Sequence, residues 1–173
     1  MNEIDRIADQ ARRTFEGPAW HGPALKEVLR DVGAQQAHTR PLAEAHTIWE
    51  LVLHVMAWQK VALRRLGGEQ VTDLPPDVDF PRIVEVTEAA WQRTLSELDG
   101  LHSETMAVIK AMADSGLDEI VGGVDAEWTA YQTLHGLIDH NLYHAGQIAI
   151  LKKATGTSSR ALHLLPNDKP PRL

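Results

Sequence analysis

Apolar side chains recur every three or four residues in four long segments of the chain, and this spacing is typical of amphipathic α-helices. The four segments are residues 2–16, 47–66, 82–113 and 129–156. Asn2 is a plausible N-cap of the first segment. Thr47 caps the second, and Glu50 three residues later completes a capping box, which Thr129 and Gln132 repeat. No set of segments shows the alternation of apolar and polar residues that is typical of β-strands. The pattern therefore predicts an all-α four-helix bundle with short accessory helices.

The connections contain the prolines and glycines that begin and end helices. Pro23 suits the first turn of a short helix that runs to about Gly33. We expect residues 34–46 to be a polar connection and residues 67–81 to be a surface loop, either functional or simply mobile. Gly100 is a position where the third long helix could kink or break.

The length of 173 residues is enough for one domain with a substantial core. We expect residues 1–156 to form this domain, and residues 115–128 could contain a short extended piece. Residues 157–173 are expected to be a tail that packs on the domain or extends from it.

Net charge, apolar runs and cysteine content limit the kinds of partner and site that the protein can have. The formal net charge is -7 at pH 7, whereas nucleic-acid phosphates and anionic membranes require a basic face. There is no run of about 18 apolar residues and no basic-then-apolar leader, so we expect neither a membrane span nor a signal peptide. The chain has no cysteine, which excludes disulfides and Cys-ligated zinc and is compatible with a cytoplasmic protein.

Two histidines lie four residues apart in the last predicted helix. His140 and His144 therefore lie one above the other on one face of that helix. Leu137 and Ile148 fall on or beside the same stripe, so the histidine pair points inward. His54 is a third inward histidine, on the second long helix. Inward imidazoles require either hydrogen bonds or a metal ion.

Both interpretations of these histidines stay open on periodicity alone. A lone buried histidine is more often a hydrogen-bonded core residue than a ligand. Helical bundles, however, build metal sites from inward side chains of facing helices, and three protein ligands leave a position open for water or substrate. The zinc-peptidase motif is excluded, because Asn141 and not a glutamate follows His140.

Nearly the whole chain, up to Gly156, resembles the DinB-like superfamily, which includes the YfiT-type metal-dependent hydrolases. The resemblance is carried by residues 20–23 (Trp-His-Gly-Pro), by residues 48–54 with Trp58, and above all by the His-x-x-x-His-x-Gly-Gln-Ile motif of residues 140–148. It implies a four-helix bundle, often a homodimer, that holds one divalent ion, nickel or zinc. By the same resemblance, the ligands are three histidines: His54, His140 and His144.

The resemblance further implies a small-molecule substrate and either hydrolysis or transfer of a low-molecular-weight thiol such as bacillithiol, mycothiol or glutathione. Because the chain has no cysteine, such a thiol must come from outside. Two alternatives stay open: a non-catalytic metal- or small-molecule-binding stress-response protein, and a structural bundle with hydrogen-bonded histidines. Five tryptophans among nine aromatic residues add weak support for a homodimer.

No catalytic residue can be assigned, but three side chains are candidates. Glu50 lies one turn before His54 and could orient a ligand or act on a bound water, unless the capping box uses it. Gln147 could contact water or substrate, and His21 could line the mouth of a pocket. His135 is expected on a different face from the inward pair. The histidines without a motif are expected to face solvent: His38, His46, His102 and His163.

Overall fold

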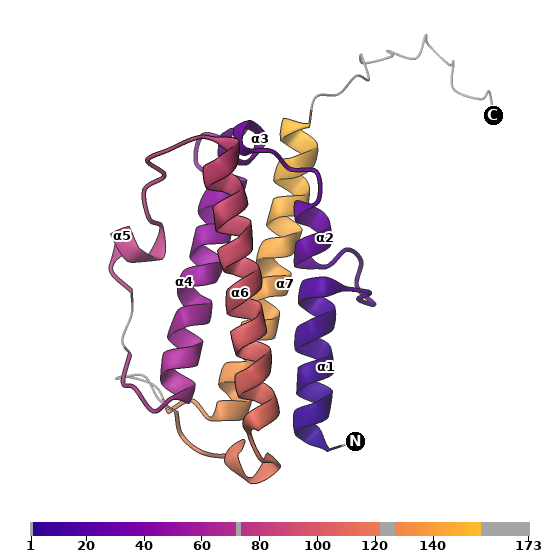
Figure 1. Ribbon diagram of the computed structural model, residues 1–173, viewed down its shortest axis with the longest axis vertical. Helices are drawn as coiled ribbons and strands as arrows, with labels where there is room; N and C mark the ends of the chain where they lie inside the picture. The colour runs from indigo at the N-terminus through magenta and orange to yellow at the C-terminus, as the bar shows by residue number, and fades with distance from the viewer. Residues whose placement is uncertain (1, 72–73, 122–126, 157–173) are drawn as a thin grey trace, which may run out of the picture.

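The computed structural model describes residues 2–71, 74–121 and 127–156. Four long helices lie side by side, two running in each direction, and together they form a bundle (Figure 1). These are α1 (Glu3–Glu16), α4 (Ile48–Leu66), α6 (Glu88–Ala111) and α7 (Ala130–Thr155). No β-strand occurs within the described ranges, and the prediction of an all-α fold is confirmed.

Side-chain caps begin three of these helices where the sequence predicts them. The Asn2 carboxamide oxygen accepts a hydrogen bond from the backbone N–H of Asp5 at 2.8 Å. At α4, the Thr47 hydroxyl accepts from the Glu50 N–H at 3.2 Å, and the Glu50 carboxylate accepts from the Thr47 N–H at 2.7 Å. The same capping box begins α7. Each cap satisfies backbone donors that a helix leaves unpaired at its start.

The third long helix is shorter than predicted. It begins at Glu88 and not at Arg82, because the Thr87 hydroxyl accepts a hydrogen bond from the Ala90 N–H and caps the helix there. It ends at Ala111, and it passes through Gly100 without a break.

Three short helices fill connections that were expected to be longer or irregular. α2 covers only Leu25–Leu29, because Asp31 adopts a positive φ of 63° that no helix accommodates. α3 (Ala34–His38) lies within the predicted polar connection, where burial of Ala34 and Ala37 stabilises it. α5 (Pro76–Asp79) lies within the predicted surface loop and packs against α4 (Figure 1).

In the described part of residues 115–129, the expected extended piece is reduced to one isolated bridge, between Ile120 and Thr129. A 3-10 turn at Asp114–Gly116 precedes it. The predicted tail, residues 157–173, lies outside the described residues.

The core has two apolar clusters. One surrounds Trp91 at the α2–α3 end of the bundle, and the other surrounds Ile7 at the opposite end. Buried polar side chains occur between them, including Gln59, whose amide donates to the Thr105 hydroxyl at 2.8 Å. His102 is also buried, so the expectation that it faces solvent is wrong: its ring stacks on Phe15 with centroids 3.9 Å apart.

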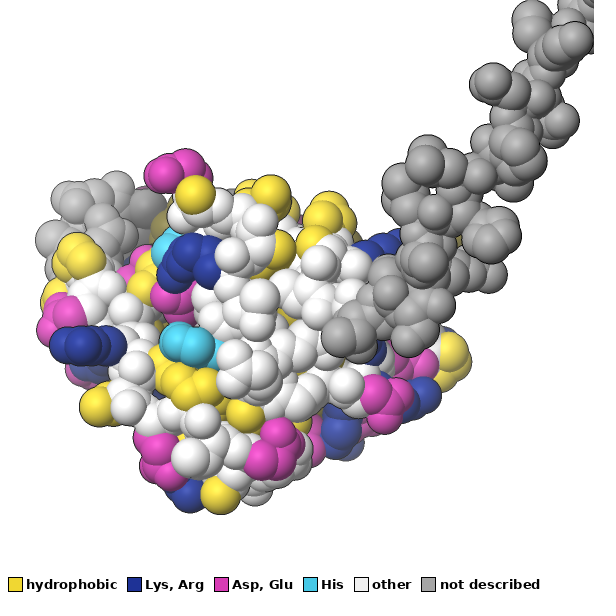
Figure 2. Space-filling view, turned by 90° about the horizontal axis from the view of Figure 1, so that it is seen from above, with side chains coloured by type: hydrophobic (Ala, Val, Ile, Leu, Met, Phe, Trp, Pro, Cys, Tyr) yellow, Lys and Arg dark blue, Asp and Glu magenta, His cyan; other side chains and the backbone are white. Residues whose placement is uncertain are grey.

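The surface mixes charges of both signs. In the view onto the α3 end, acidic, basic and apolar side chains alternate and no continuous basic patch is visible (Figure 2). None of the helices in the described part of the chain is both long enough and apolar enough to cross a membrane.

Candidate metal centre

Two helices bring three histidines to one point inside the bundle. His54 comes from α4, and His140 and His144 come from successive turns of α7, the helix against which α4 packs. The Nε2 atom of His140 lies 3.1 Å from Nε2 of His54 and 3.1 Å from Nε2 of His144. We call these residues the three-His cluster. Among the described residues, it is the one group of potential metal ligands whose donor atoms lie close together, all within 4.8 Å of one another.

Hydrogen bonds on the outer side of the cluster determine which nitrogen carries the proton. His54 Nδ1 lies 2.7 Å from Asp79 Oδ1, and a carboxylate oxygen can only accept, so Nδ1–H donates. His144 Nδ1 likewise donates to the side-chain oxygen of Gln147 at 2.7 Å. In the neutral imidazoles of His54 and His144, the Nε2 atoms therefore present lone pairs toward His140.

This arrangement is unfavourable without a cation. The Nε2 atom of His140 can carry one proton and can donate it to only one of its two neighbours. The second Nε2–Nε2 contact at 3.1 Å then leaves the lone pair of the other histidine without a hydrogen-bond donor. His140 Nδ1 is buried without a hydrogen-bond partner among the described residues, whichever ring nitrogen carries the proton. A divalent ion accepts all three lone pairs at once, so the chemistry of the donor set fits a metal.

Two of the three distances also fit. Two imidazole nitrogens bound to one tetrahedral zinc at about 2.0–2.1 Å lie about 3.3 Å apart. The Nε2–Nε2 separations from His140 to His54 and to His144, both 3.1 Å, are close to that value. A closed site would add a fourth protein ligand, whereas three ligands are typical of a catalytic site.

Burial keeps two of the three imidazoles neutral. The pKa of His140 is lowered to about 4, mainly by burial and also by the neighbouring His144 and His54. Burial also lowers the pKa of His144, although the hydrogen bond to Gln147 partly opposes this. Metal ions bind the neutral imidazole, so these two side chains are already in the binding form at neutral pH.

Asp79 and Phe80 hold the cluster from its outer side. Asp79 Oδ1 accepts a second hydrogen bond, from Trp58 Nε1 at 2.7 Å. Phe80 stacks on the His54 ring, with centroids 4.4 Å apart, and on the His46 ring, with centroids 3.7 Å apart. The end of α5 therefore orients His54 and covers one face of it.

Asp79 is not among the site residues predicted from the sequence. A signal was available, because His54 and Trp58 lie four residues apart on the inner face of one helix. Both carry an N–H that needs an acceptor when it is buried. The loop of residues 67–81 contains several carboxylates, but its length does not indicate which one reaches α4.

The structure separates the other candidates. Gln147 contacts the cluster through His144. Glu50 serves the capping box and also accepts hydrogen bonds from Arg40. His21 is exposed and lines a separate hollow beside Trp20 and Arg13. His135 packs against Tyr131 with the two rings tilted by 44°, and it lies outside the cluster, as expected.

The remaining histidines divide into three cases. His38 is exposed, as predicted. His46 is also exposed, although it stacks on Phe80. His163 lies outside the described residues.

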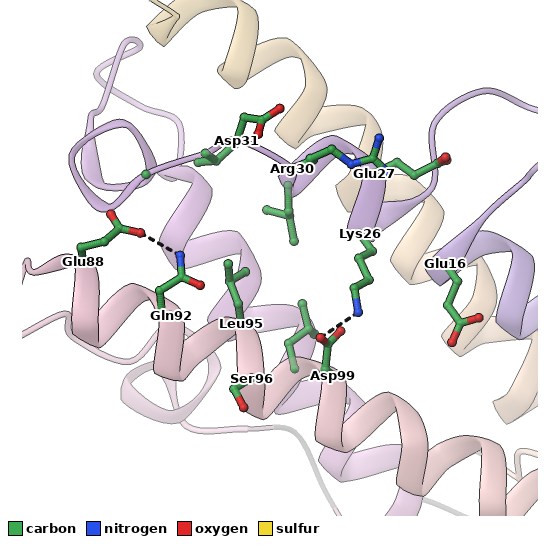
Figure 3. Close-up of a pocket in the computed structure, with 14 residues that line it drawn as sticks. Glu16, Lys26, Glu27, Arg30, Asp31, Glu88, Gln92, Leu95, Ser96 and Asp99 are labelled. Atoms are coloured by element: carbon green, nitrogen blue, oxygen red, sulfur yellow. Dashed lines mark hydrogen bonds and ion pairs between the residues drawn. The ribbon is translucent and has the colours of Figure 1, made fainter.

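Besides the hollow at His21, two hollows can be compared as binding sites. One, of about 210 Å³, lies between α4 and α7 and is lined by His140. The other is a wider groove of about 980 Å³ between α2 and α6 (Figure 3). No histidine lines that groove, and three of its charged side chains already have partners: Lys26 pairs with Asp99 at 2.8 Å, and Glu88 accepts from Gln92 at 2.7 Å. The smaller hollow is therefore the one that belongs to the three-His cluster.

Comparison with known proteins shows the family to which this helical bundle belongs. The family model of the DinB superfamily matches residues 19–148, which include the whole three-His cluster. The chain belongs to the DinB superfamily. A crystal structure of a conserved protein from Enterococcus faecalis has a similar fold, with a TM-score of 0.67 and 16% sequence identity. The similarity covers 90% of this chain and 98% of that one. No match is found among curated proteins.

Proposed function

We propose that this protein is a metal-dependent enzyme that holds one divalent ion, zinc or nickel, through His54, His140 and His144. The observation that carries the proposal is the convergence of the Nε2 atoms of three histidines. Asp79 and Gln147 accept from the Nδ1–H groups of His54 and His144, so the Nε2 lone pairs of these two residues face His140. All-imidazole ligand sets suit several late first-row metals, and zinc and nickel are the two that the family resemblance favours.

The proposed reaction is hydrolysis or the transfer of a low-molecular-weight thiol to a small molecule. A divalent ion in such a site lowers the pKa of a water or thiol that it binds, which supplies a nucleophile at neutral pH. The chain's own residues prepare the site: Asp79 and Gln147 fix the orientations of His54 and His144, and Phe80 and Trp58 pack against the His54 ring. Because the chain has no cysteine, any thiol is a second substrate from solution.

A non-catalytic metal- or small-molecule-binding protein is the second candidate, and one observation favours it. Among the described residues, Asp79 is the carboxylate paired with the cluster, and its Oδ1 already accepts two hydrogen bonds. An enzyme of this design must therefore use the substrate itself, or a group outside these contacts, as its second acid or base.

Turnover separates the two candidates. The untagged protein, loaded with zinc or with nickel, is incubated with an ester and amide panel and with thiol–electrophile pairs that use each of the three thiols. The enzyme proposal predicts turnover that is lost on chelation and in His140→Ala. Fully loaded protein that turns over neither panel supports the binding-protein alternative.

A further inference from the structure

The hollow between α4 and α7 extends away from the three-His cluster along both helices. We call it the α4–α7 pocket. Its lining residues come from facing stripes of the two helices and from the residue just before α7: Trp58, Val61, Ala62, Arg65, Trp128, Gln132, Thr133, Gly136, Leu137 and His140. At about 210 Å³, it is somewhat larger than a 150 Å³ cavity, which already accommodates benzene. The pocket therefore suits a ring-sized group with a short substituent.

The walls of the pocket are apolar and partly rigid. Trp58 and Trp128 contribute indole rings, and the Trp58 ring is held by its hydrogen bond to Asp79. Gly136 contributes no side chain, and a Cβ at that position meets nothing within 4 Å. Glycine lowers helix stability by about 1 kcal/mol relative to alanine, so Gly136 leaves open space at a cost to α7.

The two ends of the pocket are polar and chemically different. His140 lies at one end, and Gln132, eight residues earlier on α7, lies at the other. Because α4 and α7 run in opposite directions, Arg65, near the end of α4, lies at the Gln132 end (Figure 1). Eight residues of helix span about 12 Å, which is the length of a small aromatic acid with a short chain. An occupant that fills the length of the pocket therefore lies between His140 and Arg65.

Arg65 is positioned in advance. Its Nε and Nη2 both donate to the carbonyl oxygen of Val71, at 3.2 and 2.9 Å. A guanidinium carries five N–H donors, so these two contacts fix its plane and leave further donors for a second acceptor. Carboxylates match the planar guanidinium better than other common ligand groups do, apart from phosphate.

We propose that the α4–α7 pocket binds the substrate as an apolar, ring-bearing carboxylate. The ring lies between Trp58 and Trp128, the carboxylate meets Arg65, and the opposite end of the molecule reaches His140. The assignment of this molecule as a substrate rests on the proposed function, but its binding in the pocket does not depend on a metal.

The test measures binding of two probes to the metal-free protein by calorimetry. The probes are 3-phenylpropanoate and its neutral amide, 3-phenylpropanamide, and inorganic phosphate is added to see whether a phosphate alone occupies the Arg65 end. Hydrogen bonds to charged groups contribute enough to expect the carboxylate to bind about tenfold or more tightly than the amide. Arg65→Met is expected to remove this difference and to leave amide binding unchanged.

Gly136 provides a matched pair of variants. Gly136→Leu places a side chain in the open space and is expected to weaken both probes at least tenfold, whereas Gly136→Ala leaves both unchanged. Equal affinity of the two probes for the wild-type protein, no binding of either, or full binding by Gly136→Leu would overturn the proposal. Phosphate competing as strongly as the carboxylate would also overturn it, because the class of anion would then be wrong.

Failure of the pocket can be distinguished from failure of the metal site. Carboxylate binding by a protein that takes up no divalent ion would leave the pocket standing and remove the proposed metalloenzyme. Metal uptake without carboxylate binding would remove the pocket and leave the metal site.

Discussion

Asp79 links the short helix α5 to the three-His cluster, because one of its oxygens accepts from both His54 and Trp58. Residues that orient a metal-bound histidine in this way affect metal affinity about 10–100-fold when they are replaced. We therefore expect Asp79→Asn to weaken zinc binding by this factor in a competition with a fluorescent chelator. Asp77→Asn, an exposed change on the same helix, should leave the affinity unchanged. Equal losses in both variants would mean that α5 acts only through its fold.

His102 makes the stability of the metal-free protein depend on pH. Burial lowers its pKa, whereas the same side chain in the unfolded chain titrates near its ordinary value of about 6.5. As the pH falls below about 6.5, the unfolded state takes up a proton that the folded state does not, so folding stability falls. His140 and His144 act in the same direction, because their pKa values are also lowered.

Thermal unfolding at pH 7.5 and pH 5.5 tests this effect of His102. His102→Phe, which keeps a ring stacked on Phe15, should reduce the fall in melting temperature on acidification. His38→Gln, at an exposed position, should not reduce it. A fall of the same size in wild type and His102→Phe would show that His102 does not contribute.

The burial of His102 was not predicted from the sequence. His102 matched no motif and was assigned to the surface. However, Leu98, His102, Thr105 and Ile109 follow the helical spacing of one buried stripe, so periodicity could have placed it inside. Asp79 is the opposite case. Its contact with α4 depends on how a loop folds back, which the spacing of residues does not reveal.

At the scale of the elements, α4 is held by its capping box as well as by its packing. Thr47→Ala removes the hydroxyl that accepts from the Glu50 N–H, and such losses cost about 1 kcal/mol. For a chain of this length, we expect a fall of about 2–4 °C in melting temperature by circular dichroism. The melting temperature of Thr47→Ser, which keeps the hydroxyl, should fall by much less. An unchanged melting temperature in Thr47→Ala would show that the cap does not stabilise α4.

The long helices were predictable because caps and apolar periodicity agree at α1, α4 and α7. The start of α6 was not, since Ile83, Val84 and Val86 continue an apolar pattern before the Thr87 cap. α3 was missed because its sequence is mostly polar, and packing of two small alanines against neighbouring helices stabilises it.

At the scale of the whole molecule, we propose a homodimer. The five tryptophans support a dimer interface less than their number suggests, because Trp49 and Trp91 are buried in the core. Trp20 is fully exposed, and Tyr143 and Ile150 leave apolar surface on the outer side of α7. We expect light scattering at micromolar concentrations to give twice the mass of the chain. A single-chain mass across that range would contradict the dimer.

The central claim is that three histidines from two helices bind one divalent ion, and metal stoichiometry of the untagged protein tests it most directly. We predict one ion per chain in the wild type, a loss of most of it in His54→Ala, His140→Ala and His144→Ala, and full content in His135→Ala. Metal should also raise the melting temperature of the wild type, because the ion binds only when α4 and α7 are folded together. Wild-type protein that takes up no zinc or nickel, or a His140→Ala variant that keeps its metal while His135→Ala loses it, would contradict the account.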